Sequence, residues 1–370
     1  MNSAAPAPSD GRFSVCDCEL YLEHLSRLSM ARQLVLATED MVNQFGVLLL
    51  RAGTPLGPYA LDRLRGQRLN RPLDSVIALR RRPGSTDLAG LLLDFAESET
   101  ELAAISEHFG FAEKALSLCH ALQWPEALHQ RLAVLDFALP QVFHRALFCA
   151  WFASLVAEER GLPAAEVALV FEAGLLHDIG MLHIDPALAT KRADFSAGEW
   201  ADMQAHVELG AQVLEQTWAD VPPRLIRILR EHHERQDGAG YPERRLAADL
   251  DPLGSLVALA DMIHSLRFPV GIPEHPRLPE CMSFLRVHRR AFGTVNYQPA
   301  ARVLMAARGV ALRELDAGRP AVSVQGLIDV NRSMATLLSA FAAGAPLLSA
   351  LPDSRARRSL LRLIEDLGEV

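Results

Sequence analysis

A set of histidines and aspartates in the middle of this 370-residue chain has the residue types of a metal site. The chain has 13 histidines. Those in the most apolar stretches, with two aspartates, are His177, Asp178, His206, His232, His233 and Asp261. Neutral imidazoles and carboxylates are the ligands that borderline divalent cations prefer. A single histidine on an apolar helix face is usually a core residue, but four of them with two aspartates favour a metal site.

The positions of these residues indicate more than one metal ion. Asp261 lies in the apolar stretch 258–263, where an ionised carboxylate is costly without a partner, and a cation is its natural partner. Neighbouring residues on a helix point about 100° apart, so His232 and His233 on one helix would face two ions that Asp178 could bridge. Two divalent cations about 3.5 to 4 Å apart activate a water and neutralise a phosphodiester under in-line attack. Fe, Mn, Zn and Ni all suit such ligands.

A loop of unusual composition follows the histidine pair. Residues 237–242 are Asp-Gly-Ala-Gly-Tyr-Pro. Gly238 and Gly240 permit positive φ, while Pro242 fixes its own φ and pushes Tyr241 toward an extended backbone. The sequence therefore predicts that a shaped loop lies beside the paired histidines.

These motifs together resemble a known protein family. The resemblance depends on four segments: His177-Asp178-Ile179-Gly180, His206, the run His-His-Glu-Arg-Gln-Asp-Gly-Ala-Gly-Tyr-Pro from His232 to Pro242, and Ala260-Asp261. They are similar to the HD-GYP subgroup of the HD-domain metal-dependent phosphohydrolases over roughly residues 140 to 305. The resemblance implies a helical domain with a two- or three-metal centre that hydrolyses the bacterial second messenger cyclic di-GMP to linear pGpG or GMP.

The resemblance also implies roles for individual residues. The metal ligands would be His177, Asp178, His206, His232, His233 and Asp261, with His177 and Asp178 also catalytic. A surface for substrate, or for partners such as GGDEF-type signalling proteins, would comprise Asp237, Gly238, Gly240, Tyr241 and Pro242. Lys191 and Arg267 are candidate phosphate contacts, although an ordinary surface position for Arg267 stays open.

Several positions depart from the family's pattern, and three of them bear on the metals and on activity. The upstream ligand histidine should fall near position 145, where Arg145 stands beside His144, and we take His144 as the ligand. Pro140 stands where trinuclear members place a glutamate, so we expect two ions rather than three. Met181 replaces the usual lysine, and losing such a charge-assisted contact to phosphate costs about 1.5 to 3 kcal/mol. We therefore expect reduced activity.

Three functions are compatible with these motifs. The retained ligand positions favour a cyclic di-GMP phosphodiesterase. Met181 and the altered stretch around Arg267 favour a weak or inactive receptor or scaffold that binds nucleotide or partner proteins. A phosphohydrolase for another nucleotide would keep the metals and change the pocket.

Composition excludes several other classes. The formal net charge is −8 and half of the residues are hydrophobic, so we expect a globular protein that binds neither nucleic acid nor an anionic membrane. Five scattered cysteines, with Cys16 and Cys18 the closest pair, and no signal peptide predict a reduced, cytoplasmic protein. Gly344 and Pro346 make the uncharged stretch 333–352 a broken helix pair rather than a membrane span.

Hydrophobic periodicity predicts a mainly α protein, a helical HD-type bundle preceded by a small α+β domain. We expect a flexible N-terminus (1–17), the α+β domain (18–86), a helical linker (87–139), the HD-GYP domain (140–310) and a C-terminal helical extension (311–370), with a homodimer possible. Predicted strands cover 34–37, 46–50 and 75–79, and predicted helices cover 57–69, 141–159, 164–176, 223–234 and 253–266. Ser196 and Glu199 have the spacing of a helix-capping box.

Overall fold

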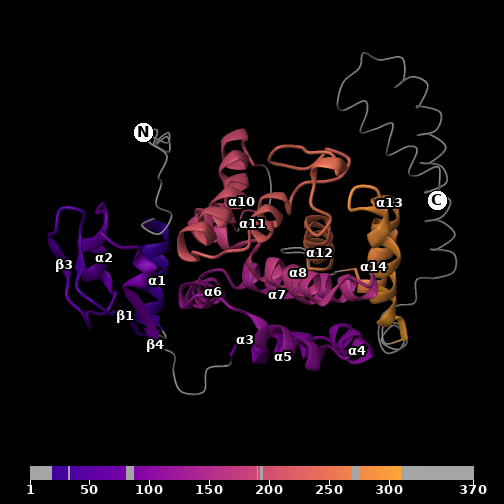
Figure 1. Cartoon of the computed structure of the whole chain (residues 1–370), viewed down its shortest axis with the longest axis horizontal. Helices are drawn as coiled ribbons and strands as arrows, with labels where there is room; N and C mark the ends of the chain where they lie inside the picture. The colour runs from indigo at the N-terminus through magenta and orange to yellow at the C-terminus, as the bar shows by residue number, and fades with distance from the viewer. Residues whose placement is uncertain are drawn as a thin grey trace, which may run out of the picture. The chain divides into compact units, whose positions relative to one another are not determined.

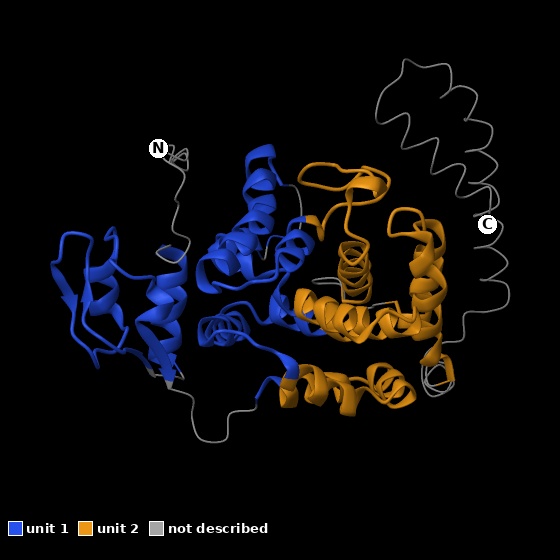
Figure 2. Ribbon diagram, viewed as in Figure 1, with its two compact units in different colours: residues 1–88, 121–147, 175–230 blue, residues 89–120, 148–174, 231–370 orange. Residues whose placement is uncertain are grey.

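The computed structural model describes residues 19–31, 34–80, 87–189, 191, 195–268 and 276–309. Over these residues the protein is mainly α-helical (Figure 1), which confirms the predicted fold class. The chain forms two compact units (Figure 2): unit 1 comprises residues 1–88, 121–147 and 175–230, and unit 2 comprises residues 89–120, 148–174 and 231–370. The predicted N-terminal tail, the basic run 81–85 and the extension 311–370 lie outside the described residues, and the predicted domain boundaries remain predictions.

Unit 1 begins with the small α+β part that the sequence predicts. In order, its elements are α1 (Glu19–Ala31), β1 (Leu34–Ala37), β2 (Met41–Val42), β3 (Leu48–Leu50), α2 (Pro58–Leu64), the 3-10 turn η2 (Leu73–Ser75) and β4 (Ile77–Arg80). β1 pairs antiparallel with β4, placing Leu36 opposite Ala78, and β2 pairs antiparallel with β3. The three predicted strands are confirmed. β2 was not predicted, because two residues are too few to show an alternating pattern.

The rest of unit 1 is helical and carries four of the seven predicted ligands. It contains α6 (Glu126–Ala138), the start of α7 (Pro140–Glu159), the 3-10 turn η3 (Ile179–His183), α9 (Pro186–Ala189), α10 (Ala197–Thr217) and α11 (Pro223–Glu231). The predicted capping box is present: the Ser196 hydroxyl accepts from the Glu199 amide, and the Glu199 carboxylate accepts from the Ser196 amide. Helix α1 packs against α6 and η3.

Unit 2 contains an aromatic core. Its elements are α3 (Leu88–Glu97), α4 (Thr100–Phe109), α5 (Phe111–Ala121), the rest of α7, most of α8 (Ala164–Leu176), η4 (Ala247–Asp249), α12 (Gly254–Arg267), η5 (Leu278–Cys281), α13 (Met282–Val287) and α14 (Thr294–Ala306). Trp151 is fully buried, and its ring contacts those of Phe95, Phe111 and Phe148 at centroid distances of 5.5 to 6.5 Å. Helix α7 is therefore fixed along its length by core packing.

Two predicted helix ends are wrong, since the helix expected over 57–69 already ends at Leu64. The helix expected over 223–234 ends at Glu231, so His232 and His233 lie in the turn that follows α11. Gly240 packs directly on the backbone that follows this helix end, because a Cβ there would lie 2.4 Å from the Arg235 nitrogen. The loop thus folds back onto the residues after the histidine pair. Because His232 and His233 do not lie on a helix, the expected angle of about 100° between them no longer supports two ions.

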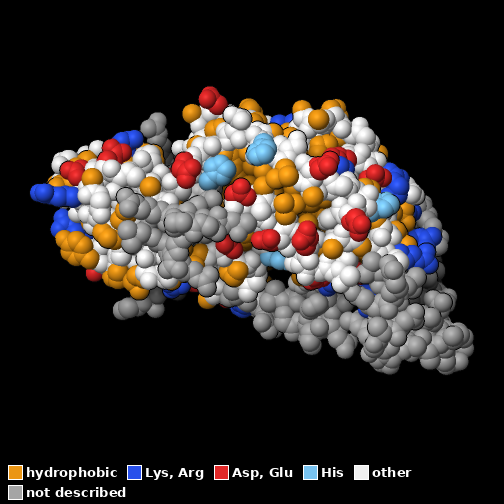
Figure 3. All heavy atoms as spheres, turned by 90° about the horizontal axis from the view of Figure 1, so that it is seen from below, with side chains coloured by type: hydrophobic (Ala, Val, Ile, Leu, Met, Phe, Trp, Pro, Cys, Tyr) orange, Lys and Arg blue, Asp and Glu red, His pale blue; other side chains and the backbone are white. Residues whose placement is uncertain are grey.

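The distribution of charged side chains on the surface agrees with the composition of the chain. Acidic side chains lie scattered over the face seen in Figure 3 and form no single patch there, as the modest charge of −8 leads one to expect. Within the described residues, no helix combines the length and the apolar composition that a bilayer span needs.

Candidate metal centre

Asp178 lies at the centre of a buried polar cluster in unit 1. It follows the end of α8 and caps η3, and its side chain is 2% exposed. Its Oδ2 atom lies 3.2 Å from Nε2 of His177, and its Oδ1 atom lies 3.4 Å from Nε2 of His206. Helix α10 supplies His206 from 28 positions further along the chain. Three of the predicted ligands are therefore brought together.

Close packing between η3 and α10 makes this meeting possible. A Cβ on Gly180 would lie 2.1 Å from the carbonyl oxygen of His206 and 2.6 Å from the nitrogen of Gly210. Real side-chain atoms do not approach backbone atoms so closely. Because glycine stands at position 180, the turn that carries Asp178 lies directly on the helix that carries His206.

The hydrogen bonding of His206 prepares its other nitrogen for a cation. Nδ1 lies 2.6 Å from the carbonyl oxygen of Met203, and since a carbonyl only accepts, Nδ1 carries the proton. In the neutral imidazole, Nε2 then has a lone pair, and it faces a carboxylate oxygen of Asp178. Two acceptors that face each other form a natural place for a cation, and a backbone contact of this kind is how proteins orient metal-binding histidines.

The charges around Asp178 favour its ionised form. Burial alone would raise the pKa of this carboxyl group, but His177, His206 and Arg145 together hold its pKa well below the usual value. Arg145, on α7, places Nη1 3.5 Å from Asp178 Oδ2. Asp178 is therefore a carboxylate over the whole physiological pH range.

Unit 2 contains a second cluster of donors. The rings of His232 and His233 lie with centroids 4.1 Å apart. Nδ1 of His233 lies 3.7 Å from Oδ2 of Asp261, which α12 supplies. The ring of Tyr241 stacks on that of His233, with centroids 4.5 Å apart and planes at 25°. Asp261 and the buried Cys149 of α7 also place donor atoms within 4.8 Å of one another.

The sequence of the segment that contains both clusters identifies its family. The sequence model of the HD domain matches residues 142–266. This chain carries an HD domain. The predicted resemblance is thereby confirmed, and the matched segment includes every predicted ligand, from His144 to Asp261.

Curated relatives of the HD domain are named as cyclic-dinucleotide phosphodiesterases. A 3'3'-cGAMP-specific phosphodiesterase 2 of Vibrio cholerae is 35% identical over 33% of this chain and 22% of its own length. A cyclic di-GMP phosphodiesterase of Thermotoga maritima is 29% identical over 31% of this chain and 32% of its own length. The chain therefore matches about a fifth to a third of these relatives. A solved HDG"Y"P protein from Bdellovibrio bacteriovorus, 18% identical, covers 75% of this chain and 97% of its own with a TM-score of 0.40.

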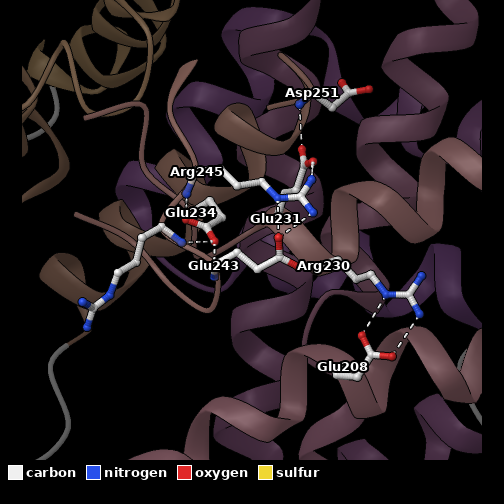
Figure 4. Close-up of polar contacts among 8 residues, drawn as sticks. Glu208, Arg230, Glu231, Glu234, Glu243, Arg245 and Asp251 are labelled. Atoms are coloured by element: carbon white, nitrogen blue, oxygen red, sulfur yellow. Dashed lines mark hydrogen bonds and ion pairs between the residues drawn. The ribbon is translucent and has the colours of Figure 1, made fainter. Parts of the chain in front are cut away.

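Two glutamates beside the paired histidines of the HD domain hold the following loop (Figure 4). The Glu234 carboxylate is buried and accepts hydrogen bonds from three consecutive amides, those of Glu243, Arg244 and Arg245, at 2.6 to 3.0 Å. Glu231 accepts from the Asp251 amide at 2.6 Å and from the Arg245 guanidinium at 3.2 Å. These carboxylates therefore shape the loop.

The predicted loop residues make local contacts. Asp237 receives a hydrogen bond from the Ala239 amide at 2.9 Å and pairs with Arg235 at 3.0 Å. Gly238 has φ +71°, and the Tyr241–Pro242 peptide is cis. The Tyr241 amide donates to the His233 carbonyl at 3.0 Å. The loop is thus fixed to the histidine pair.

The other residues that the sequence singled out are the candidate phosphate contacts Arg267 and Lys191, the proposed ligand His144, and Met181. Arg267 pairs with Glu99 and with Glu101, at 3.4 Å for the latter, and only 12% of its side chain is exposed. Lys191 pairs with Glu199 at 2.6 Å. His144 is half-buried on α7 beside Arg145, and Met181 is buried in η3.

The donor set of the HD domain fits divalent cations. Each unit contains a buried carboxylate beside imidazole nitrogens, the ligand types that Fe, Mn, Zn and Ni accept. Cys149 is a further potential ligand that sequence reasoning missed. It lies four residues after Arg145, hence on the same face of α7, but no motif of the resemblance includes it.

Proposed function

We propose that the HD domain is a metal-dependent phosphodiesterase that hydrolyses a cyclic dinucleotide, with cyclic di-GMP as the first candidate substrate. The observation that carries the proposal is the buried Asp178 carboxylate between the Nε2 atoms of His177 and His206. The names of the curated relatives support the substrate class.

In this proposal six side chains of the HD domain would hold divalent cations. His177, Asp178 and His206 come from unit 1 and His232, His233 and Asp261 from unit 2, and one HD-domain match includes all six. Each oxygen of Asp178 faces a different imidazole, so Asp178 would hold a cation together with His177 and His206. His144 remains the proposed additional ligand.

The protein's own groups would prepare the site for an anionic substrate. Bound divalent cations would supply a positive field that stabilises the phosphoryl charge and eases deprotonation of the attacking water. Ionised Asp178 would orient that water by accepting its hydrogen bond. His206 keeps its proton on Nδ1 through the Met203 carbonyl, so that Nε2 stays available as a donor of its lone pair. The loop 237–242 would line the substrate surface, with Tyr241 held over His233.

Turnover with a matched variant tests the proposal. The whole chain is incubated with cyclic di-GMP and with 3'3'-cGAMP in the presence of Mn²⁺ or Fe²⁺, beside Asp178→Asn, which keeps the shape and removes the charge. We expect hydrolysis to pGpG or GMP that falls at least about a hundredfold in the variant, because a transition-state charge loses its stabilisation. Absence of hydrolysis and of bound metal would defeat the proposal.

A second candidate function is a nucleotide receptor or scaffold with little turnover. The contact between Arg145 and Asp178 favours it, because a fixed guanidinium at a carboxylate weakens the attraction for a divalent cation. The engagement of Arg267 with Glu99 and Glu101 also favours it, since Arg267 is then less available to phosphate. Binding of cyclic di-GMP without hydrolysis, measured by calorimetry, would select this function.

A further inference from the structure

A cavity lies in unit 1, and none of the predicted metal ligands lines it. Its volume is about 470 Å³, and it is lined by the α+β part, by the start of α6 and by the end of α10. Pockets of about 300 to 1,000 Å³ are the usual size for small ligands. The α+β part and the helices that form the cavity belong to the same compact unit.

The cavity walls offer hydrogen-bond acceptors and negative charge. Among the described residues that line it, the charged ones are Asp74 and Glu126, and none is lysine or arginine. Gln130 also lines it, is 4% exposed, and its Oε1 atom has no hydrogen-bond partner within the described part of the chain. A buried acceptor that is left unpaired destabilises the fold, and a donor from a ligand would remove that cost.

This lining selects the class of ligand. An anion such as a phosphorylated nucleotide would meet the Glu126 carboxylate, which no lining cation balances, and the Asp74 carboxylate, whose charge Arg131 already balances. A small molecule with N–H donors and a positive charge would satisfy Gln130 and be attracted by Glu126. The lining therefore suits a primary amine or a guanidinium compound.

A buried network leads from the cavity wall to the turn after Asp178. Oδ2 of Asp74 accepts from Arg131 Nη2 at 2.5 Å and from Nε at 3.1 Å, and Oδ1 accepts from the Tyr21 hydroxyl at 2.9 Å. Arg131 is fully buried, and its Nη1 donates to Nε2 of His183, the last residue of η3, at 3.0 Å. Arg131 thus links a lining carboxylate to the turn that Asp178 caps.

We propose that this cavity binds a small amine-bearing molecule and that Arg131 transmits its binding to the turn of residues 178–183. A ligand cation beside Asp74 competes with Arg131 for the carboxylate, and Arg131 contacts His183 in turn. The binding part of this proposal is independent of the proposed hydrolysis, whereas the transmission part concerns the same Asp178 cluster.

Calorimetry on the whole chain without added metal tests the binding. Ethanolamine, putrescine and agmatine are the probes, and choline, which lacks N–H donors, and inorganic phosphate are the controls. We expect at least one amine to bind with 1:1 stoichiometry, and choline and phosphate not to bind. Gln130→Leu and Glu126→Gln should each weaken that binding about tenfold, while Glu113→Gln, at an exposed position on α5, should not. Absence of amine binding, or equal affinity in all variants, overturns the proposal.

Transmission is tested by two readouts. The affinity for Mn²⁺ should change at least about fivefold when the amine is saturating, the range of typical coupling between sites, and His183→Leu should abolish that change. Amide hydrogen exchange of residues 178–183 should change on amine binding even without metal. If Mn²⁺ does not bind at all, the proposed function fails while the exchange readout still decides transmission. If both the hydrogen exchange of residues 178–183 and the Mn²⁺ affinity stay unchanged on amine binding, the proposed transmission is overturned.

Discussion

Nη1 of Arg145 lies 3.5 Å from Oδ2 of Asp178, so a permanent cation touches the carboxylate proposed as the bridging metal ligand. The same position is the one where the HD-GYP resemblance implies a ligand histidine. An arginine cannot act as a ligand, because its guanidinium keeps its proton at all physiological pH values. Arg145 therefore places a competing positive charge beside this carboxylate.

Replacement of Arg145 should therefore strengthen metal binding. We expect Arg145→His to bind Mn²⁺ about tenfold more tightly than the natural chain, because it removes a repulsive charge and adds a donor. Arg145→Met, which only removes the charge, should give a smaller gain. Calorimetric titration with Mn²⁺ measures both. Weaker binding in both variants would mean that Arg145 supports the site instead of opposing the cation.

The contact of η3 with α10 predicts that alanine substitutions at Gly180 and Gly198 have different effects on stability and metal binding. In Gly180→Ala the new methyl group would meet the His206 carbonyl, so the turn and the helix must separate. We expect a loss of about 1 to 3 kcal/mol in the free energy of unfolding, the usual cost of overpacking, together with weaker Mn²⁺ binding because Asp178 and His206 move apart.

Gly198→Ala is the matched control, since a Cβ there has open space near the start of α10. It should leave metal binding unchanged and stabilise the chain by up to about 1 kcal/mol. Urea unfolding of the two variants gives the comparison. Equal stabilities would contradict the close contact between η3 and α10.

Much of the fold follows from local patterns. The four-residue strand Leu34–Ala37 and the helix Ala164–Leu176 have the bounds predicted from apolar runs and their flanking residues. The capping box of α10 was predictable because both of its partners lie within three residues. Local signals suffice wherever the forces that begin or end an element are local.

Contacts between distant segments escaped prediction. After the end of α11, Gly240 lies against the backbone of Glu234 and Arg235, a contact that helical periodicity cannot show. Arg131 lies within α6, and its partners Asp74 and His183 are more than 50 residues away. The approach of His206 to Asp178 was predicted from the family's motif, whereas the role of Gly180 in it required the structure.

Glu234 should stabilise the loop through its negative charge. Its carboxylate accepts three amide hydrogen bonds in a buried position. In Glu234→Gln one oxygen becomes an NH₂ group that faces N–H donors, so we expect a loss of about 2 to 4 kcal/mol in the free energy of unfolding. The Tyr241 ring should also lose its stacking on His233, which the ring-current shifts of the His233 protons would report.

Glu243→Gln provides the control on the same loop. The Glu243 side chain is 63% exposed and pairs with Arg245, so its substitution should change stability by less than about 0.5 kcal/mol. Equal effects of the two substitutions would show that charge on the loop, rather than the buried carboxylate of Glu234, matters.

The buried His24 of α1 predicts that stability falls in mildly acidic solution. Burial, followed by the nearby Arg27, lowers the pKa of His24 from 6.5 to about 4, against a smaller opposing effect of Glu23. The unfolded chain therefore binds more protons than the folded chain below pH 6.5. The stability that neutral His24 provides is complete above that pH and is lost as the pH falls toward 4.

Between pH 7 and pH 5 this loss should reach about 2 kcal/mol for a shift of this size. Burial and the guanidinium of Arg131 also hold the pKa of His183 well below its usual value, so His183 adds to the loss in the same direction. Urea unfolding at both pH values should show a smaller loss in His24→Leu than in the natural chain, because the substituted residue does not titrate. An undiminished pH dependence in His24→Leu would mean that His24 is not kept neutral by the fold.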